Sequence, residues 1–539
     1  MPSFRTVFEA FESSCSRWGS RPFLALTRTL NGGDQALDFD TVRSRSLHWS
    51  ERLRAAGYGP RHRIAISVGN RPEHFVLQLA LNAIGVSAVP INPDLTTDEL
   101  AYVLDHSEAI LVITDAVRAP AIARAILVLT RPVAVMSDQD EHCPVATEPC
   151  DAGIVDERTE ASLLYTSGTT GRPKGCMLSN AYYFRIGRAY AEAGGAATVR
   201  PGLERILNPL PVYHQNAGIF SFMCALLSGG CVLMTDRFHA STWWQEVVES
   251  RATIIHYLDV MPAILLKMPA APFEAVQRVR FGIGAGVEPS LHALFEARFG
   301  FPLIELWGMT ETGCGFIASS VTREVGTRAV GRPRPGHSDD LEVRLVDDED
   351  RDVAPGAIGE LLVRRPGPDP RQGMFSGYLK DEAATEEAWK GGWFRTGDAF
   401  WQDVQGVLHF AERKKNIVRR SGENIAAAEV EAVLLQHADV AQVAVIAVRD
   451  EIREEEVMAC VVGARAGDDK RLSCELFALC MERLAYYKAP GWFVFLDAIP
   501  VTSTQKVQKA RIFLPGYDAR THPRAIDMRS AKKRPPARS

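Results

Sequence analysis

Apolar positions follow two alternating patterns over the first 340 residues. The segments 46–56 and 74–84 carry apolar residues at helical spacing, whereas 63–68, 86–91 and 109–114 are short, mostly apolar runs typical of buried strands. The strand pattern returns at 205–209, 231–235 and 252–258. Helices and strands that take turns at this spacing form mostly parallel sheets covered by helices, so we expect a layered α/β fold.

The pattern changes at about residue 340. Segments 341–346 and 359–363 alternate apolar and polar residues between polar turns, which predicts a small β-rich unit over about 340–412. After Arg413, predicted helices at 428–436 and 473–485 and strands at 441–448 and 492–496 indicate a separate α+β module. The expected domains are 1–414, which includes the β-rich unit, and 415–520. A disordered tail rich in Arg, Lys and Pro is expected at 521–539.

Composition narrows the class of protein. A chain of 539 residues is too long for one core, and 46% hydrophobic with 24% charged residues is ordinary for a globular protein. A net charge of −5 gives no indication of a nucleic-acid partner. No apolar run reaches eighteen residues and no signal peptide is recognised, so we expect a cytoplasmic protein without an integral membrane segment. Ten cysteines without a C-x-x-C pair predict reduced thiols. A homodimer is possible, and the sequence does not decide the oligomeric state.

The segment 165–175, YTSGTTGRPKG, follows an apolar run at 161–164. Its glycines expose backbone N–H groups, its hydroxyls add donors, and Lys174 adds a positive charge. It is not a Walker A loop, and a mobile surface turn is the alternative. The sequence therefore predicts a phosphate-binding loop made by Thr166, Ser167, Gly168, Thr169, Thr170, Gly171 and Lys174.

This loop resembles the signature of the adenylate-forming (AMP-binding) superfamily, which includes acyl-CoA synthetases, luciferases and peptide-synthetase adenylation domains. Five further segments resemble the same superfamily in the same order, and together they span 160–511. The resemblance implies a large N-terminal α/β region with a small β-barrel-like subdomain, followed by a small mobile α+β domain.

The segment 307–311, WGMTE, resembles the superfamily's aromatic-Gly-x-Thr-Glu motif. The resemblance implies that Trp307 and Gly308 lie at the adenine, that Thr310 meets the α-phosphate, and that Glu311 holds Mg²⁺. A carboxylate suits that task because Mg²⁺ prefers oxygen ligands. A Thr-Glu pair standing alone would more often be a helix cap.

Other segments imply the rest of a nucleotide site. Asp398 resembles the ribose-binding aspartate, and Arg413 a second nucleotide contact. Alone, Asp398 would be read as a turn residue. Lys415 falls at the superfamily's interdomain hinge, and Asn416 replaces a common acidic residue after it. An adenine-facing run is implied at Gly284, Ala285 and Gly286, where Val287 and Glu288 depart from the usual pattern.

Two late segments imply the mobile part of the site. Gly422 and Glu423 resemble the segment that lines a pantetheine tunnel. Lys506 stands where the superfamily has a mobile lysine that bridges the carboxylate and the α-phosphate, although Gln505 replaces the usual glycine. Without the upstream motifs, a Gln-Lys pair would carry no role.

The implied activity is that of an ATP-dependent acyl-CoA synthetase. A carboxylic acid attacks the α-phosphate of ATP, with Lys506, Thr310, Glu311 and Lys174 as catalytic residues. The acyl-adenylate then passes its acyl group to coenzyme A. The alternatives are an adenylation enzyme that loads a carrier protein and a luciferase-like oxidase. Segment 211–218 has no acid for a substrate ammonium, and no carrier attachment site follows residue 511, which favours coenzyme A.

The acid itself is less defined. His214 resembles the residue at the mouth of the acyl pocket, with a packed loop histidine as the alternative. Segments 243–265, 298–313 and 449–455 are most similar to crotonobetaine/carnitine-CoA ligases, and a medium-chain or aryl acid ligase competes. Asp259 could pair with a substrate trimethylammonium beside Tyr257, although a position just before the helix expected near Met261 favours a helix cap.

Overall fold

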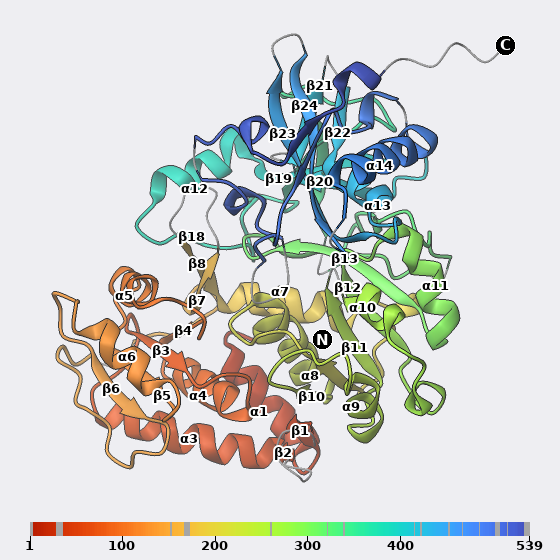
Figure 1. Ribbon diagram of the computed structural model, residues 1–539. Helices are drawn as coiled ribbons and strands as arrows, with labels where there is room; N and C mark the ends of the chain where they lie inside the picture. The colour runs from red at the N-terminus through yellow and green to blue at the C-terminus, as the bar shows by residue number, and fades with distance from the viewer. Residues whose placement is uncertain are drawn as a thin grey trace.

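The computed structural model of the chain describes residues 4–27, 36–150, 153–166, 173–258, 261–320, 322–337, 340–413, 416–420, 423–450, 453–465, 467–484, 486–501, 507–514 and 516–532. Four sheets organise these residues. Figure 1 shows the two α/β sheets of the N-terminal region at one end of the molecule and the C-terminal sheet at the other.

The first sheet has seven strands in the order β18-β8-β7-β4-β3-β5-β6. Its central strands are parallel, and β8 pairs antiparallel with both β7 and β18. The strands are β3 (Arg63–Ser67), β4 (Ser87–Pro90), β5 (Leu111–Thr114), β6 (Ala134–Ser137), β7 (Glu160–Thr166), β8 (Lys174–Ser179) and β18 (Gly377–Tyr378).

The second sheet has eight strands in the order β14-β13-β12-β11-β9-β10-β1-β2. Only its two edge strands run antiparallel to their neighbours. The strands are β1 (Pro22–Leu26), β2 (Ala36–Asp38), β9 (Arg205–Asn208), β10 (Cys231–Met234), β11 (Ile254–Leu258), β12 (Phe281–Ala285), β13 (Leu303–Met309) and β14 (Gly313–Ile317). The predicted layered, mostly parallel α/β architecture is confirmed.

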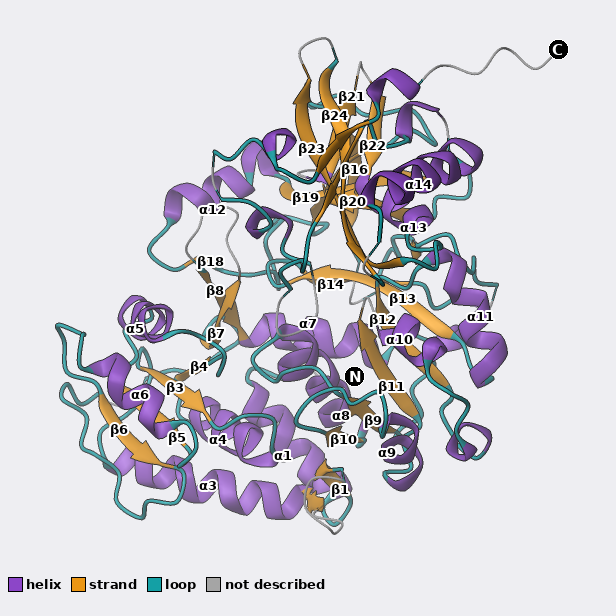
Figure 2. Ribbon diagram, viewed as in Figure 1, coloured by secondary structure: helices purple, strands orange, loops and turns teal. Residues whose placement is uncertain are grey.

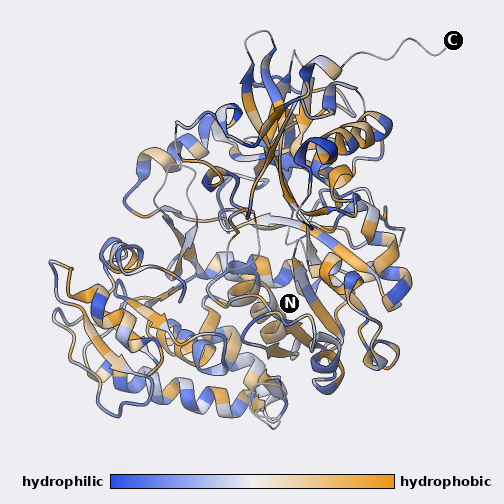
Figure 3. Cartoon of the chain, in the orientation of Figure 1, coloured by the Kyte–Doolittle hydropathy of each residue, from blue (hydrophilic) through white to orange (hydrophobic). Residues whose placement is uncertain are grey.

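Helices cover both sheets and join them through one core. Apolar residues of α1 (Val7–Trp18), α4 (Pro72–Ala83), α7 (Asn180–Ala191) and α8 (Phe222–Ser228) share a buried cluster with strands of both sheets. The helices α3 (Phe39–Ala55), α5 (Thr97–His106) and α6 (Ala119–Ile126) cover the first sheet, and α9 (Trp243–Glu249), α10 (Met261–Lys267) and α11 (Pro289–Phe299) cover the second. Figure 3 shows polar residues on the outer side of α3.

The third sheet is the predicted β-rich unit, and it is open. Its order is β15-β20-β19-β17-β16, and within the described residues its two edge strands do not pair with each other, so no closed barrel forms. All neighbours are antiparallel. The strands are β15 (Ala329–Gly331), β16 (Glu342–Val346), β17 (Gly359–Arg364), β19 (Phe394–Gln402) and β20 (Leu408–Arg413), with α12 (Glu382–Ala388) beside them.

The C-terminal sheet has the order β22-β21-β24-β25-β26, with β23 also paired to β24. Its strands are β21 (Ile417–Arg420), β22 (Glu423–Ala426), β23 (Val440–Asp450), β24 (Glu454–Gly463), β25 (Trp492–Phe495) and β26 (Ala525–Asp527). Helices α13 (Ala427–Leu434) and α14 (Asp469–Arg483) pack on it through a buried cluster (Figure 2). The predicted α+β module is therefore present; its boundary at residue 415 stays a prediction.

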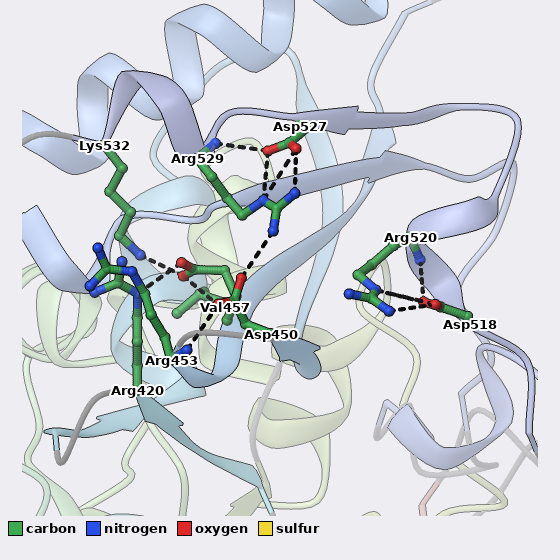
Figure 4. A network of polar contacts seen from close by, with 10 residues as sticks. Arg420, Asp450, Arg453, Val457, Asp518, Arg520, Asp527, Arg529 and Lys532 are labelled. Carbon is green, nitrogen blue, oxygen red and sulfur yellow. Dashed lines mark hydrogen bonds and ion pairs between the residues drawn. The ribbon is translucent and has the colours of Figure 1, made fainter.

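The expectation of disorder from residue 521 is wrong for 525–532. Strand β26 pairs with β25, and Lys532 Nζ donates to Glu456 Oε1 at 2.6 Å. Arg420 Nε donates to the other oxygen of Glu456 at 2.8 Å, and all three side chains are buried (Figure 4). A composition rich in basic residues predicts disorder only if the charges stay solvated, and here a buried carboxylate holds one of them.

Helix α3 begins seven residues before the predicted helix 46–56. Asp38 caps its first turn, because the Asp38 side chain accepts a hydrogen bond from Thr41 N at 2.7 Å. The prediction rested on apolar spacing, which did not mark this first turn.

Candidate active site

Lys174, Tyr378 and Glu311 form one line of contacts. The Lys174 ammonium lies 4.7 Å from the centre of the Tyr378 ring, and Tyr378 O–H donates to Glu311 Oε1 at 2.9 Å. Lys174 Nζ is also 3.8 Å from Asp381 Oδ2. The predicted phosphate loop and the predicted Mg²⁺ residue are thus joined through a tyrosine from a third segment.

Sheet pairing explains why these distant segments meet. Lys174 begins β8, and Tyr378 pairs with Cys176 in that strand. Thr166 is the partner of Lys174 across β7 and β8. Glu311 lies in the turn between β13 and β14, and its carbonyl accepts from Phe375 N at 2.9 Å. Cys176 is fully buried and burial raises the pKa of its thiol, which agrees with a packing role.

The environment of Glu311 fits a divalent cation. The residue is 7% exposed, and burial raises the pKa of its carboxyl while the Tyr378 hydrogen bond lowers it. Among the described residues, no lysine or arginine forms an ion pair with Glu311. A buried carboxylate without a cationic side chain is costly unless another cation neutralises it, and a hard ion such as Mg²⁺ takes oxygen ligands of this kind.

Side chains of α7 hold the turn that carries Thr310. Tyr182 O–H donates to the Thr310 carbonyl at 2.7 Å, and the Arg185 guanidinium donates to the carbonyls of Thr312 and Cys314. Gly308 cannot be replaced easily, since a Cβ there would lie 2.3 Å from the Gly313 carbonyl oxygen. These contacts fix the turn between β13 and β14.

Trp307, Asp398 and Arg413 meet at the other end of the site. The Trp307 indole N–H donates to Asp398 Oδ2 at 2.9 Å, and Arg413 Nε lies 3.8 Å from Asp398 Oδ1. Asp398 and Arg413 are paired residues of β19 and β20. The predicted adenine, ribose and second nucleotide contacts are therefore adjacent side chains.

Gly284, Ala285 and Gly286 lie at the carboxyl end of β12, beside Trp307 on the next strand. A Cβ on Gly284 would lie 2.1 Å from the Tyr257 carbonyl oxygen, so glycine is required there. Glu305 of β13 accepts from Gly286 N at 3.0 Å and from Val287 N at 2.9 Å. Burial raises the pKa of Glu305 to about 7, and these two backbone donors lower it.

The segment with His214 lies over a neutral buried network. His214 is exposed, whereas His256 is fully buried. Asn208 Nδ2 donates to Asn216 Oδ1 at 2.9 Å, which identifies that atom as oxygen, so His256 Nδ1–H donates to it at 2.7 Å. Tyr190 O–H then donates to His256 Nε2 at 3.1 Å. Burial lowers the pKa of His256 to about 3, so the network is uncharged at neutral pH.

The connection to the C-terminal sheet is only partly described. Glu412 accepts from Asn416 Nδ2 at 3.2 Å and from Ala428 N at 3.0 Å, which links β20 to the start of α13. The Glu423 backbone lies in β22. The remaining predicted site residues lie outside the described residues: Ser167, Gly168, Thr169, Thr170, Gly171, Asp259, Lys415, Gly422 and Lys506.

Sequence reasoning missed three residues that hold the site together: Tyr182, Glu305 and Tyr378. Each acts on a segment far away in the chain or on the backbone of a loop. The only available signal was a lone acid, Glu305, two residues before Trp307 in an otherwise apolar strand. Nothing in the sequence pattern marked the two tyrosines.

Comparison with known families matches two consecutive segments. Residues 11–379 match the AMP-binding enzyme family, and residues 429–506 match the AMP-binding enzyme C-terminal domain. The chain belongs to the AMP-binding enzyme family. It is an AMP-forming acid–thiol ligase that uses ATP, Mg²⁺ and coenzyme A.

Several relatives of this ligase match along most of their length. It is 29% identical to a sulfoacetate–CoA ligase of Cupriavidus necator, covering 94% of this chain and 97% of the relative. It is 30% identical to a 2-succinylbenzoate–CoA ligase of Bacillus licheniformis, covering 89% and 95%. A crotonobetaine/carnitine–CoA ligase of Citrobacter koseri is 28% identical, covering 85% and 89%.

Among solved structures, the ligase is similar to an o-succinylbenzoate CoA synthetase from Bacillus subtilis. The complex of that enzyme with its acyl-adenylate superposes with a TM-score of 0.77 at 25% identity, covering 95% of this chain and 98% of the other. Its complex with ATP and a magnesium ion gives the same TM-score and identity, covering 93% and 97%. None of the described helices of the ligase combines the length and apolarity needed to cross a membrane.

Proposed function

We propose that this ligase activates a carboxylic acid whose acyl part is compact and uncharged, and that it transfers the acyl group to coenzyme A. The site residues have the following roles. In the first half-reaction a carboxylate oxygen forms a bond to the α-phosphorus of ATP while the bond to the β-phosphate breaks and pyrophosphate leaves. Lys174 and the loop 166–171 neutralise the departing phosphates. Lys506 bridges the carboxylate and the α-phosphate.

The buried carboxylate of Glu311 would hold Mg²⁺, which supplies positive charge at the phosphates. Thr310, on the same turn, donates to the α-phosphate. At the nucleoside end, Asp398 accepts from the ribose hydroxyls, and Trp307 with Gly284, Ala285, Gly286 and Gly308 forms the adenine surface. The Trp307 N–H donated to Asp398 and the nearby Arg413 support this assignment, because they orient the aspartate before the nucleotide arrives.

In the second half-reaction the sulfur of coenzyme A forms a bond to the acyl carbon, and the bond to the adenylate oxygen breaks to release AMP. Gly422 and Glu423 would line the pantetheine path, and Lys415 would be the hinge that brings them to the site. A two-domain enzyme can in this way exclude water during the first step and admit a thiol in the second.

The single observation that carries the substrate class is the uncharged network behind the proposed acyl pocket. The partly or fully exposed residues Tyr213, His214, Gln215 and Asn216 carry no formal charge at neutral pH, and His256 behind Asn216 is neutral. The Asn216 amide nitrogen donates no hydrogen bond to a described residue, although its oxygen is fixed by His256 and Asn208. An acid whose body is aryl or medium-chain, with one hydrogen-bond acceptor, suits such a lining.

A betaine-like acid is the second candidate. The similarity to crotonobetaine/carnitine–CoA ligase over 85% of this chain supports it. Such a substrate needs an anionic or aromatic partner for its trimethylammonium group. The carrier-loading alternative keeps the first half-reaction and changes only the thiol acceptor. The luciferase-like alternative keeps the first half-reaction and replaces thiol transfer by oxidation.

The test is a panel of acids in which pyrophosphate release and acyl-CoA formation are measured separately, with and without coenzyme A. We expect thioester with neutral aryl or medium-chain acids. Turnover of carnitine and crotonobetaine, with neutral acids ignored, would replace the first substrate class by the second. Pyrophosphate release without any acyl-CoA product would favour carrier loading.

A matched pair of variants localises the acyl group. Asn216→Leu keeps the size of the side chain but removes its donor, together with the oxygen that accepts from His256 and Asn208. KM should therefore rise about tenfold more for an acid with an acceptor than for a plain acid of equal size. Gln139→Leu, at an exposed position just after β6, is the control and should leave both values near those of the wild type. An equal rise for both acids in Asn216→Leu would contradict the assignment.

A further inference from the structure

Glu324, Asp403 and His409 bring three potential metal ligands together outside the site that contains Glu311. One ligand atom from each side chain lies within 4.8 Å of the other two. His409 is on β20, Asp403 is in the turn that joins β19 to β20, and Glu324 is in the segment before β15. Figure 1 shows β19 and β20 above β13, away from the strands that carry Lys174 and Tyr378.

The surroundings of His409 fix its ring in an orientation that suits a metal ligand. Its side chain is fully buried, and the ring stacks on Trp401 with centroids 3.8 Å apart and planes 7° apart. Nδ1–H donates to the Thr327 carbonyl at 3.1 Å, so in the neutral ring the lone pair is on Nε2. Metal-binding histidines are oriented by such a bond on their other nitrogen. Nε2 is buried and has no hydrogen-bond partner in the described part of the chain.

The unpartnered Nε2 faces two carboxylates. It lies 3.5 Å from Glu324 Oε2 and 3.6 Å from Asp403 Oδ2. The other oxygen of Asp403 accepts from Gln405 N and Val407 N, both at 2.8 Å, so the turn itself directs Oδ2 toward His409. Glu324 is partly exposed and leaves a route for an ion from solvent.

These separations suit a shared ion better than a direct contact. A nitrogen-to-oxygen hydrogen bond spans roughly 2.7–3.2 Å, which is shorter than either distance. Two ligands held about 2.1 Å from one ion lie roughly 3.0–3.5 Å apart in octahedral or tetrahedral geometry. Within the described residues, no lysine or arginine pairs with Glu324 or Asp403, and the nearby Arg323 and Arg328 pair with Glu296 and Glu288 instead.

We propose that Glu324, Asp403 and His409 form a binding site for a divalent first-row transition ion, with Zn²⁺ as the probe. One imidazole nitrogen and two carboxylate oxygens are ligands that such ions accept, and solvent would complete the coordination. The ion would fasten the β19–β20 turn to the segment before β15. Arg413, which pairs with Asp398 in the middle of β19, ends β20 four residues beyond His409, so the site is structural and takes no part in the reaction.

The test uses the full-length enzyme, stripped with a chelator and dialysed. Zn²⁺ is added back, unbound ion is removed, and bound zinc is measured by elemental analysis together with the midpoint of thermal unfolding. We expect one zinc per chain and a saturable rise in Tm that an equal concentration of Mg²⁺ does not produce.

Glu324→Gln and Asp403→Asn keep the shape of each side chain and should each weaken zinc binding at least about tenfold. Glu349→Gln, an exposed acid in the turn between β16 and β17 of the same sheet, is the matched control and should bind as the wild type does. Because Glu324 is partly exposed, its variant should fold normally. No zinc uptake by the wild type, or uptake unchanged in both variants, would overturn the proposal.

Discussion

At the scale of single residues, Tyr378 has a position that no motif indicates. Its ring lies under the Lys174 ammonium and its hydroxyl donates to Glu311. One side chain therefore orients both the cation and the carboxylate that we assign to the phosphates. The two interactions use different parts of the tyrosine, so they can be separated by substitution.

Tyr378→Phe should keep the ring beneath Lys174 but remove the hydrogen bond to Glu311. Burial raises the pKa of Glu311 and the Tyr378 hydroxyl lowers it, so loss of the hydroxyl should raise that pKa further. Glu311 must be ionised to hold Mg²⁺, and activity should therefore fall at a higher pH on the acidic side of the profile. The measurement is kcat/KM for pyrophosphate release against pH. Tyr517→Phe, far along the chain and partly exposed, is the control; an unshifted acidic limb in Tyr378→Phe would argue against the contact.

Glu305→Gln tests whether Glu305 positions the backbone of Gly286 and Val287, in the loop that we place against adenine. The amide can accept only one of the two backbone N–H groups, so we expect KM for ATP to rise and stability to fall by about 1–3 kcal/mol. Tyr257→Phe is the matched control, because it removes only the 3.3 Å hydrogen bond from Tyr257 O–H to Glu305.

The same variant makes a prediction about pH. Burial raises the pKa of Glu305 from 4.5 to about 7, so the folded state keeps a proton that the unfolded chain releases between these values. The contribution of Glu305 to wild-type stability should then fall as pH rises from 4.5 to 7. The glutamine variant lacks this contribution, so the gap in stability between the two proteins should narrow by about 3 kcal/mol. Denaturant unfolding at pH 5 and pH 7.5 measures the gap. A constant gap would contradict the raised pKa.

At the scale of elements, local patterns predicted the parallel strands and the motifs well. Strands β3, β5 and β11 lie where apolar runs predict them, because a buried parallel strand is recognisable from its own residues. The pairing of β18 with β8 could not be predicted, since it joins Tyr378 to Cys176, which lies 202 residues earlier in the chain. Resemblance alone assigned Trp307 and Asp398 to one nucleotide site. The hydrogen bond between them was not predicted, because no periodicity relates residues on separate sheets.

For strand β26, the expectation of disorder, which rested on composition, was wrong. Lys532→Met should remove one of the two basic partners of the buried Glu456 and destabilise the C-terminal module by about 3 kcal/mol. The readout is hydrogen exchange at β24 and β25 together with thermal unfolding. Arg520→Met, which loses an ion pair with the exposed Asp518, is the control. Equal stability of the two variants would show that the tail is dispensable.

At the scale of the whole molecule, the ligase has two structural parts joined after β20. The three sheets before residue 414, with the turns between their strands, hold every described residue that we assign to the nucleotide. The proposed Lys506 and pantetheine segment belong to the C-terminal part. Glu412 lies at the end of the N-terminal part and contacts the C-terminal part, since its carboxylate accepts from Asn416 and from the backbone of Ala428. Two reactions with different needs for water and thiol then require the C-terminal part to take two positions.

Lys415→Pro and Lys506→Ala should separate the two half-reactions in opposite directions. Proline fixes φ at residue 415 and restricts the residue before it, so adenylate formation should persist while transfer to coenzyme A falls. Lys506→Ala removes a contact used in the first transition state, so adenylate formation should fall severely while thioester formation from supplied acyl-adenylate remains. Lys415→Ala keeps the backbone free and should behave as the wild type. Single-turnover assays of each half-reaction measure the split, and a proline variant with both rates intact would mean that the rotation occurs elsewhere in the chain.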